Sequence, residues 1–516
     1  MKRGGIFAAA LLLAGCAGSA APPRAFVVPP ETGTATARTQ AALGAIERLN
    51  PRLNAVIAVE PQALTEARAL DASQAPRGAL FGMPVLVKDN IETRGPLPTT
   101  AGSLALKDNV TGRDAPLVAR LRGAGAVIVG KANLSEWANM RSSNSISGWS
   151  PVGGQVRNPH ALDRNACGSS SGSAAAVAAG MVPAAIGTET DGSITCPAAI
   201  SGIVGLKPSV GLVSRTHIVP ISASQDTPGP MTRNVRDAAL LLAAMAGRDP
   251  ADPATAEADA RRADYAAALT DTALRGKRIG VMRFADGFGT EGPFEEALAT
   301  LRREGAVLVD IDKFEGRSAI GEAEFAVLLA EFKAGLNAYL ATTPPTVRTR
   351  NLADLIAFNR ANAAAELPLF GQDVFEQAEK TAGLTDPAYL KARADSYRMA
   401  GPEGIDRLLK AQRLDALVGP TMAPAWPIDA VNGDQIAGGG AGSLAAVGGY
   451  PHLTVPMGAV RGLPVGLSFI GPKWSDALIL ALGYDYEQAS RKLVAPRFLR
   501  SVEESPEVAP LLEPRR

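Results

Sequence analysis

The segments Cys167-Gly-Ser-Ser-Ser-Gly-Ser173 and Gly187-Thr-Glu-Thr-Asp-Gly-Ser193 lie close together in the chain. Glycine and serine at this density give a backbone that turns tightly and can direct several N–H groups and hydroxyls at one point. Stabilisation of the oxyanion in acyl transfer requires such a cluster of donors. A single lysine, Lys88, ends an apolar segment upstream. Together these features predict a serine hydrolase whose base is not histidine.

Length and composition indicate a globular enzyme. The chain has 516 residues, of which 46% are hydrophobic and 20% charged, enough apolar content for a large core. The formal net charge is +1, and the lysines and arginines are scattered, so the basic patch that a nucleic-acid partner requires is missing. We expect a small or short-peptide substrate, and no nucleic acid, cofactor or obligate protein partner.

The N-terminus has the features of an export signal. Lys2 and Arg3 precede an apolar run, residues 6–13, that is too short to span a bilayer, and Cys16 follows Leu-Ala-Gly. This order resembles a bacterial lipobox, in which the signal is cut before the cysteine and the cysteine takes a lipid. We therefore expect residues 1–15 to be a lipoprotein signal peptide and Cys16 to be lipidated.

The residues after Cys16 extend this interpretation. Ala17, and not aspartate, follows the cysteine. Among bacterial lipoproteins this favours the outer membrane in a cell with two membranes. Residues 16–39 should then form a flexible tether, because the part from 18 to 39 is rich in alanine, proline and threonine. The expected location is the periplasmic side of the cell envelope, with the lipid as the only membrane contact. The alternative is an ordinary signal cleaved nearby, which leaves the protein periplasmic or secreted.

Helix and strand patterns alternate along residues 40–500, which predicts a single α/β domain with a layered sheet. Apolar runs between turn residues predict strands at 53–59, 81–88, 126–129, 416–418, 452–456 and 463–468. Helical spacing predicts helices at 41–49, ended by Pro51, and at 117–123 and 173–180.

Two further regions have a distinct composition. Residues 252–414 are rich in alanine, glutamate, arginine and leucine with helical spacing, so we expect helices that cover the sheet rather than hold the chemistry. Part of this region could wall the substrate pocket. Residues 501–516 are acidic and contain several prolines, which predicts a loose C-terminal tail.

Cys167 and Cys196 are the only cysteines besides Cys16, and both lie beside the serine segments. An oxidising compartment permits a disulfide between them. The sequence does not show that their β-carbons face each other, so we expect small buried thiols.

A histidine base is disfavoured. Gly168-Ser-Ser-Ser-Gly172 satisfies the Gly-x-Ser-x-Gly pattern of α/β-hydrolases, but that pattern needs a preceding strand and residues 163–167 do not read as one. A Ser-His-Asp triad also needs one of three histidines, each of which has an ordinary explanation as a turn, loop or strand residue. They are His160, His217 and His452.

Other kinds of site fit less well. No serine has a lysine three residues later, which excludes the β-lactamase pattern. Gly125-Ala-Val-Ile-Val-Gly-Lys131 nearly matches a phosphate-binding loop, but Ala132 replaces the required serine or threonine. The histidines are far apart and no two have a metal-ligand spacing, so no metal site is expected. A lysine base remains.

Lys88, the cluster around Ser169 and the pair Gly192-Ser193 resemble the amidase signature family, whose site is a Ser-Ser-Lys triad. The similarity covers most of the chain and is densest in residues 165–237. The resemblance implies a single-domain α/β/α fold with a large central mixed β-sheet covered by helices. It also implies hydrolysis of an amide C–N bond through an acyl-enzyme.

Individual roles follow from the resemblance. Ser193 matches the nucleophile, and Ser169, 24 residues earlier, matches the bridging serine that the family holds on a cis peptide bond. Lys88 matches the base. The oxyanion hole is matched by the backbone N–H groups of Thr190, Asp191, Gly192 and Ser193.

This chemistry requires a neutral lysine. The unperturbed pKa of lysine is about 10.4, so holding Lys88 neutral at pH 7 costs about 4.6 kcal/mol, which burial at the end of an apolar strand could supply. Lys88 would then take a proton from Ser169, and Ser169 one from Ser193, which attacks the amide carbonyl. A solvated lysine at a strand end is the ordinary interpretation, and only the serine segments overturn it.

Departures from the common family pattern point to a substrate. Cys167 and Ser171 replace glycines, Asp191 replaces a glycine, and Thr195 replaces an arginine; these choices resemble the peptide amidase branch, which removes ammonia from C-terminal peptide amides. Asp191 and Ser170 are candidate substrate contacts. A carboxylate at Asp191 would repel a substrate that ends in a free carboxylate, although a turn-stabilising role is at least as plausible.

Three alternatives stay open from sequence. One is a general aliphatic or aryl acylamidase of the same family, another is a Ser-His-Asp esterase of the α/β-hydrolase type, and the third is a secreted binding protein that has lost catalysis. The subunit that feeds ammonia to misacylated transfer RNA also belongs to the family, but it is cytosolic and needs partner subunits. The export signal argues against that role.

Overall fold

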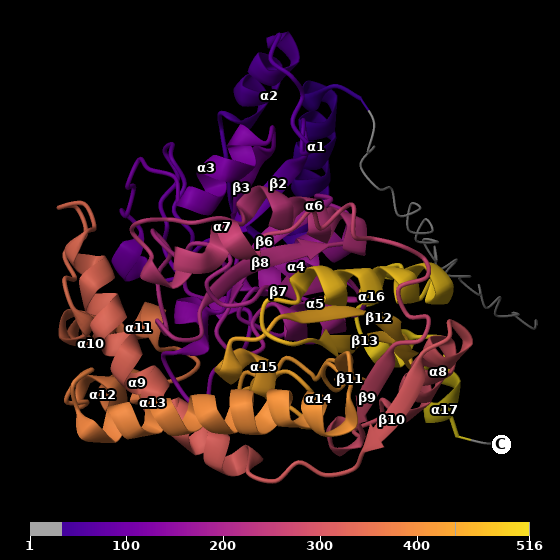
Figure 1. The fold of residues 1–516 in the computed structure, drawn as a ribbon. Coiled ribbons are helices and arrows are strands. Elements are labelled where there is room, and N and C mark those ends of the chain that lie inside the picture. The colour runs from indigo at the N-terminus through magenta and orange to yellow at the C-terminus, as the bar shows by residue number, and fades with distance from the viewer. Residues whose placement is uncertain (1–32, 439, 515–516) are drawn as a thin grey trace, which may run out of the picture.

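A single large mixed sheet organises the computed structural model, which describes residues 33–438 and 440–514 (Figure 1). Eleven strands lie in the order β1-β3-β2-β6-β8-β7-β12-β13-β11-β9-β10, and β4 pairs only with β5. The strands are β1 (Val56–Val59), β2 (Pro84–Lys88), β3 (Val127–Ala132), β4 (Trp149–Ser150), β5 (Gly154–Gln155), β6 (Ala184–Glu189), β7 (Val204–Lys207), β8 (Thr227–Thr232), β9 (Arg278–Met282), β10 (Val307–Ile311), β11 (Ala416–Pro420), β12 (His452–Val460) and β13 (Leu463–Ile470).

Helices lie on both faces of this sheet (Figure 1). They are α1 (Ala35–Leu53), α2 (Ala63–Ala72), α3 (Pro116–Gly123), α4 (Ser171–Ala178), α5 (Thr195–Ser201), α6 (Val235–Met245), α7 (Ala258–Arg261), α8 (Glu291–Arg303), α9 (Arg317–Ala341), α10 (Leu352–Ala361), α11 (Ala363–Glu366), α12 (Asp373–Glu379), α13 (Pro387–Ala400), α14 (Arg407–Gln412), α15 (Ser443–Gly448), α16 (Asp476–Ser490) and α17 (Ala509–Leu512).

Alternation along β2 shows how the two layers are filled. Val85 and Val87 pack in a cluster with α3, α6, α8 and α16, whereas Leu86 packs on the opposite face with α1, α2 and α4. Successive strand side chains point to opposite faces, so a strand buried on both sides must be apolar throughout. This arrangement confirms the predicted α/β/α fold with a central mixed sheet.

The sheet also fixes where the candidate groups meet. β2 and β6 are parallel neighbours, with Val87 opposite Ile186. Their carboxyl ends therefore lie at the same edge, which brings Lys88 beside Thr188 and Glu189. The serine segments continue from this edge, one before β6 and one after it.

Close packing of α4 beneath this edge depends on a glycine. A Cβ at Gly172 would collide with the backbone of Ala55 and Asn133. Because no side chain intervenes, the helix approaches the ends of β1 and β3 directly. The serine at the helix N-terminus is thereby held against the sheet.

Two predicted boundaries are wrong. Helix α1 starts at Ala35, inside the segment predicted as tether, and continues past Pro51 to Leu53. Pro51 lies in the last turn, where the backbone N–H of Asn54 still reaches the carbonyl of Asn50, and the helix ends at Asn54 in a left-handed conformation. A proline removes one donor without preventing the bonds around it. The predicted signal peptide and Cys16 lie outside the described residues.

Residues 252–414 are not wholly helical, contrary to the prediction. They contain β9 and β10, two short parallel strands that extend the sheet beyond β11. Their short apolar runs lie among residues whose composition and spacing favour helix, and so the sequence pattern groups them with the helices. The remaining helices of this region include α9, which packs on both α12 and α13 at one side of the molecule (Figure 1).

The C-terminal segment is also more ordered than predicted. It contains α17, and Val502 and Val508 pack against Ala161 and Leu463. Two apolar side chains among acidic residues are enough to dock it. Within residues 33–438 and 440–514, no helix combines the length and apolar character needed to cross a bilayer.

Candidate active site

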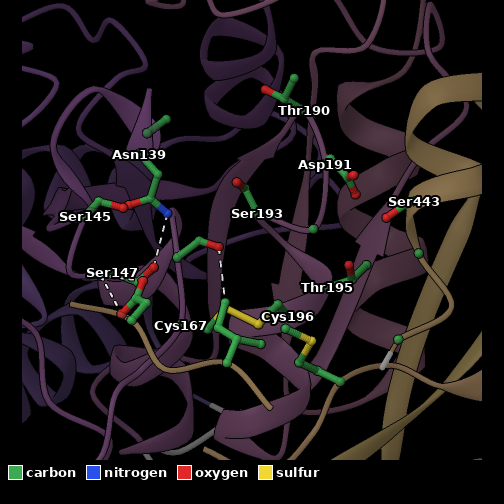
Figure 2. A pocket seen from close by; sticks show the side chains of 18 of the residues that line it. Asn139, Ser145, Ser147, Cys167, Thr190, Asp191, Ser193, Thr195, Cys196 and Ser443 are labelled. Atoms are coloured by element: carbon green, nitrogen blue, oxygen red, sulfur yellow. Dashed lines mark hydrogen bonds between the residues drawn. A yellow bond between two sulfur atoms is a disulfide. The ribbon is translucent and has the colours of Figure 1, made fainter. Parts of the chain in front are cut away.

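A pocket of about 500 Å³ opens at the carboxyl edge of β6 (Figure 2). Ser193 lies on its wall together with Thr190, Asp191 and Gly192, all from the turn between β6 and α5. The opposite walls come from distant parts of the chain. They include Asn139, Ser147, Cys167, Leu328, Met422, Asp434 and Ser443.

Lys88 lies behind this wall and is fully buried. Its Nζ is 2.7 Å from Ser169 Oγ, 2.9 Å from Thr188 Oγ1 and 3.2 Å from the Thr188 carbonyl oxygen. A second donor, Asn90 Nδ2, also reaches Thr188 Oγ1 at 3.0 Å. The lysine predicted as base is therefore hydrogen-bonded to the serine predicted as its partner.

Burial changes the acid–base character of Lys88. Loss of solvent lowers the pKa of Lys88 to about 7, against the opposing effect of the Asp226 and Glu189 carboxylates, which favour the charged form. Removing water from an ammonium group disfavours its charge. A substantial fraction of Lys88 is thus neutral near pH 7.

The two serine segments are joined through their backbones. The peptide bond between Gly168 and Ser169 is cis, as the resemblance implies, and Ser169 is fully buried. The Ser170 backbone N–H donates to the carbonyl oxygen of Ser193 at 3.1 Å. Among residues 33–438 and 440–514, the Ser193 hydroxyl makes no hydrogen bond and faces the pocket (Figure 2).

The turn that carries Ser193 leaves its donors free. In the described part of the chain, the N–H groups of Thr190, Asp191, Gly192 and Ser193 donate to no other residue. Gly192 has a φ of +78°, a left-handed conformation that favours glycine. Free backbone donors on the wall of a pocket are available to a negatively charged oxygen.

Glu189 anchors the far side of this turn. Its Oε2 accepts hydrogen bonds from the backbone N–H groups of Ile194 at 2.8 Å and Thr195 at 2.9 Å. Thr195 Oγ1 donates to the same oxygen at 3.2 Å. The carboxylate therefore fixes the residues directly after Ser193 at the start of α5.

Of the two candidate substrate contacts, Asp191 lines the pocket and Ser170 does not. Asp191 lies on the pocket wall, where burial, and next the Glu189 carboxylate, raise the pKa of Asp191 to about 6. Ser170 is fully buried, and its hydroxyl donates to the Thr188 carbonyl oxygen and accepts from the Thr188 N–H. Ser170 supports β6 and does not reach the pocket, so its prediction as a substrate contact is wrong.

None of the histidines lines the pocket. His452 Nε2 is 2.7 Å from Ser468 Oγ, but both side chains are fully buried and the His452 Nδ1 atom has no hydrogen-bond partner. His160 is buried against the carbonyl oxygen of Ser201. No strand precedes Gly168, since residues 164 and 165 form only isolated bridges. No histidine of the described chain therefore lines the pocket that holds Ser193, which argues against a Ser-His-Asp site there.

The expectation of free thiols is wrong, because Cys167 and Cys196 form a disulfide with a Cα–Cα distance of 6.1 Å. The backbone contact between Ser170 and Ser193 brings their segments together, and this approach is invisible in the sequence. Figure 2 shows the bond at the pocket wall below Ser193.

Several residues of the site gave no signal in the sequence. Asp434 accepts hydrogen bonds from the Ser147 backbone N–H, Asn165 Nδ2 and Trp426 Nε1 at 2.9 to 3.0 Å, and so ties its loop to the pocket. Thr188 lies in the serine-containing segment Gly187–Ser193, but only the pairing of β2 with β6 places it beside Lys88. Leu328 of α9 shows that the region 252–414 does contribute a wall.

Comparison with known families agrees with this geometry. The family model described as Amidase matches residues 37–480. The chain belongs to the amidase family. A probable amidase of Arabidopsis thaliana is 41% identical over 89% of this chain and 87% of its own length. A glutamyl-tRNA(Gln) amidotransferase chain of Pseudomonas aeruginosa is 36% identical over 88% of this chain and 93% of its own.

A solved structure is more similar still. The peptide amidase of Stenotrophomonas maltophilia is 53% identical, with a TM-score of 0.86 over 90% of this chain and 96% of that chain. Together with the amidase relatives, this structure identifies the protein as a hydrolase that acts on amide C–N bonds.

Proposed function

We propose that this amidase hydrolyses the C-terminal amide of a short peptide, or a similar small amide, and releases ammonia. The observation that carries the proposal is the buried hydrogen bond between Lys88 Nζ and Ser169 Oγ, which lies behind the pocket wall that carries the Ser193 hydroxyl. The similarity to a peptide amidase supports the substrate class.

The proposed reaction starts from neutral Lys88, which accepts the proton of Ser169 as Ser169 accepts that of Ser193. Ser193 Oγ attacks the amide carbonyl carbon, and the backbone donors of Thr190 to Ser193 stabilise the oxyanion. The proton returns to the leaving nitrogen as the C–N bond breaks, giving ammonia and an acyl-enzyme. Water then releases the acid. The Ser169–Ser193 step requires the two hydroxyls to come within hydrogen-bond distance, since they are not hydrogen-bonded to each other in the structure.

Alanine substitution tests these roles. Ser193→Ala, Ser169→Ala and Lys88→Ala should each lower kcat for a peptide amide by about a thousandfold or more, because members of one relay act as a unit. Ammonia release is the measurement, and the exposed pair Ser318→Ala and Lys107→Ala should retain wild-type rates. Ammonia release that persists at wild-type rates in Ser193→Ala and Lys88→Ala would refute the assignment.

The pH profile tests the base. Only neutral Lys88 accepts a proton, so kcat/KM should rise with pH through about 7 and level off above it. Asp226 favours the charged lysine, so Asp226→Asn should move the midpoint to lower pH. A profile that is flat across pH 7 in the wild type, or an upward shift in the variant, contradicts the role of Lys88.

Asp191 gives the proposed preference for amides a physical cause. Above pH 6 its carboxylate would repel a substrate that ends in a carboxylate, and the effect should weaken as pH falls through about 6 and Asp191 is protonated. Asp191→Asn should therefore narrow the ratio between cleavage of a peptide amide and cleavage of the last internal bond of the same peptide acid. If the ratio stays unchanged, Asp191 stabilises the turn only.

We also propose that the enzyme is exported and lipid-anchored through Cys16 in the cell envelope. The lipobox-like sequence supports this location. Cys16→Ser should shift the amidase from the membrane fraction to the soluble periplasmic fraction on cell fractionation. Membrane association that is equal in both forms would overturn the lipid anchor.

A further inference from the structure

The disulfide between Cys167 and Cys196 connects the two segments that carry the proposed catalytic serines. Cys167 lies two residues before Ser169, and Cys196 lies three residues after Ser193 in the first turn of α5. One covalent bond thus joins the backbone just before Ser169 to the backbone just after Ser193. Neither the amide chemistry nor the family membership assigns a role to this bond.

The hydrogen bonds between these segments all involve Ser170, whose hydroxyl donates to the Thr188 carbonyl oxygen at 3.1 Å and accepts from the Thr188 N–H at 3.2 Å. The Ser170 N–H donates to the Ser193 carbonyl oxygen at 3.1 Å, and the Cys196 N–H donates to the Gly192 carbonyl oxygen at 2.8 Å within the turn itself. The Ser169 carbonyl oxygen is engaged elsewhere, by the Ser135 N–H. In the described chain, no hydrogen bond joins residues 167–169 directly to residues 192–196, so the disulfide is the direct link between these two stretches.

The backbone at Cys167 indicates that the side chain is there for the bond. Its φ is +53°, in the left-handed region where a Cβ is unfavourable and glycine is preferred. A glycine at this position would remove that cost but also the cross-link. A cysteine in this unfavourable backbone conformation is explained if the disulfide that it forms contributes to the site.

The disulfide also lies at the wall of the pocket. Both cysteines line the pocket, with 5% and 6% of their surfaces exposed, and pack on Ile200, Ala425 and Trp426. A small dithiol that enters the pocket therefore approaches the bond from the pocket side.

We propose that the Cys167–Cys196 disulfide is a positioning element that holds Ser169 and Ser193 in register, and that its reduction by a dithiol lowers turnover reversibly. The step is thiol–disulfide exchange: the protein S–S bond takes two electrons and two protons and becomes two thiols, while the dithiol becomes a cyclic disulfide. Small displacements of reacting groups are costly in rate, so loss of register acts on the chemical step. The effect on turnover rests on the proposed amidase function.

The test compares the oxidised and the reduced full-length enzyme. Dithiothreitol is added under native conditions, and opening of the bond is verified by a mass increase of two hydrogens and by thiol titration. We expect kcat for a peptide amide to fall by about ten- to a hundredfold with KM changed far less, and to recover on reoxidation. Assays are run well below the thermal midpoint of the reduced form, with circular dichroism as a check on folding.

Variants separate positioning from general stability. The double variant Cys167→Ala/Cys196→Ala should match the reduced wild type in kcat and should not respond to dithiothreitol. Cys16→Ser, with the disulfide intact, should respond as the wild type does, because Cys16 is the only other cysteine. If the fully reduced wild type and the double variant both keep kcat within about twofold of the oxidised enzyme, the bond does not position the serines.

A second readout is independent of the reaction. Backbone hydrogen exchange in peptides covering residues 165–173 and 190–198 should become faster on reduction, whereas β12 and β13 should stay unchanged. If the oxidised enzyme hydrolyses no amide, the proposed function fails and this readout alone decides the inference. Unchanged exchange in both serine segments would overturn it.

Discussion

The buried amine of Lys88 is the constraint on which the rest of the site depends. A charged ammonium group at this position would lie among the ends of β2 and β6 with little access to water, and burial brings its pKa to about 7. The surroundings of Lys88 are therefore a balance between desolvation and two carboxylates. Asp226 and Glu189 pull the pKa upward, and both are also tied into hydrogen bonds of the site.

Two acidic groups lie close to the lysine that we propose as the base, and both also have a structural role. Glu189 accepts hydrogen bonds from the first residues of α5. Asp226 accepts a hydrogen bond from the Thr190 hydroxyl at 2.6 Å. Each carboxylate thus orders the turn around Ser193 and at the same time limits how far the pKa of Lys88 falls. A lysine with a much lower pKa would be neutral at every relevant pH but a weaker base.

Apolar runs in the sequence were sufficient for an α/β class and for six of the thirteen strands in the described chain, whereas the α/β/α fold and the pairing of Lys88 with Ser169 were implied by the family resemblance. The sequence did not single out β6, β7 and β8 of the central sheet, nor β9 and β10, whose apolar runs lie in a region of helical composition. The disulfide, the burial of Ser170 and the contacts of Asp434 depend on how distant segments approach, and no local pattern encodes that approach. The extent of α1 past Pro51 shows the same limit at a helix end.

The pocket draws its parts from two separate sources. The groups that we propose to react belong to β2, the segment before α4 and the turn after β6, all within the central layers, while Leu328, Asp434 and Ser443 come from α9 and from the segment before and at α15. Exchange of the second set leaves the strand pairing and the buried lysine untouched. The architecture thus separates the groups that we propose to react from this part of the pocket wall, so that substitutions in the wall can change the shape of the pocket while the proposed reacting groups stay in place.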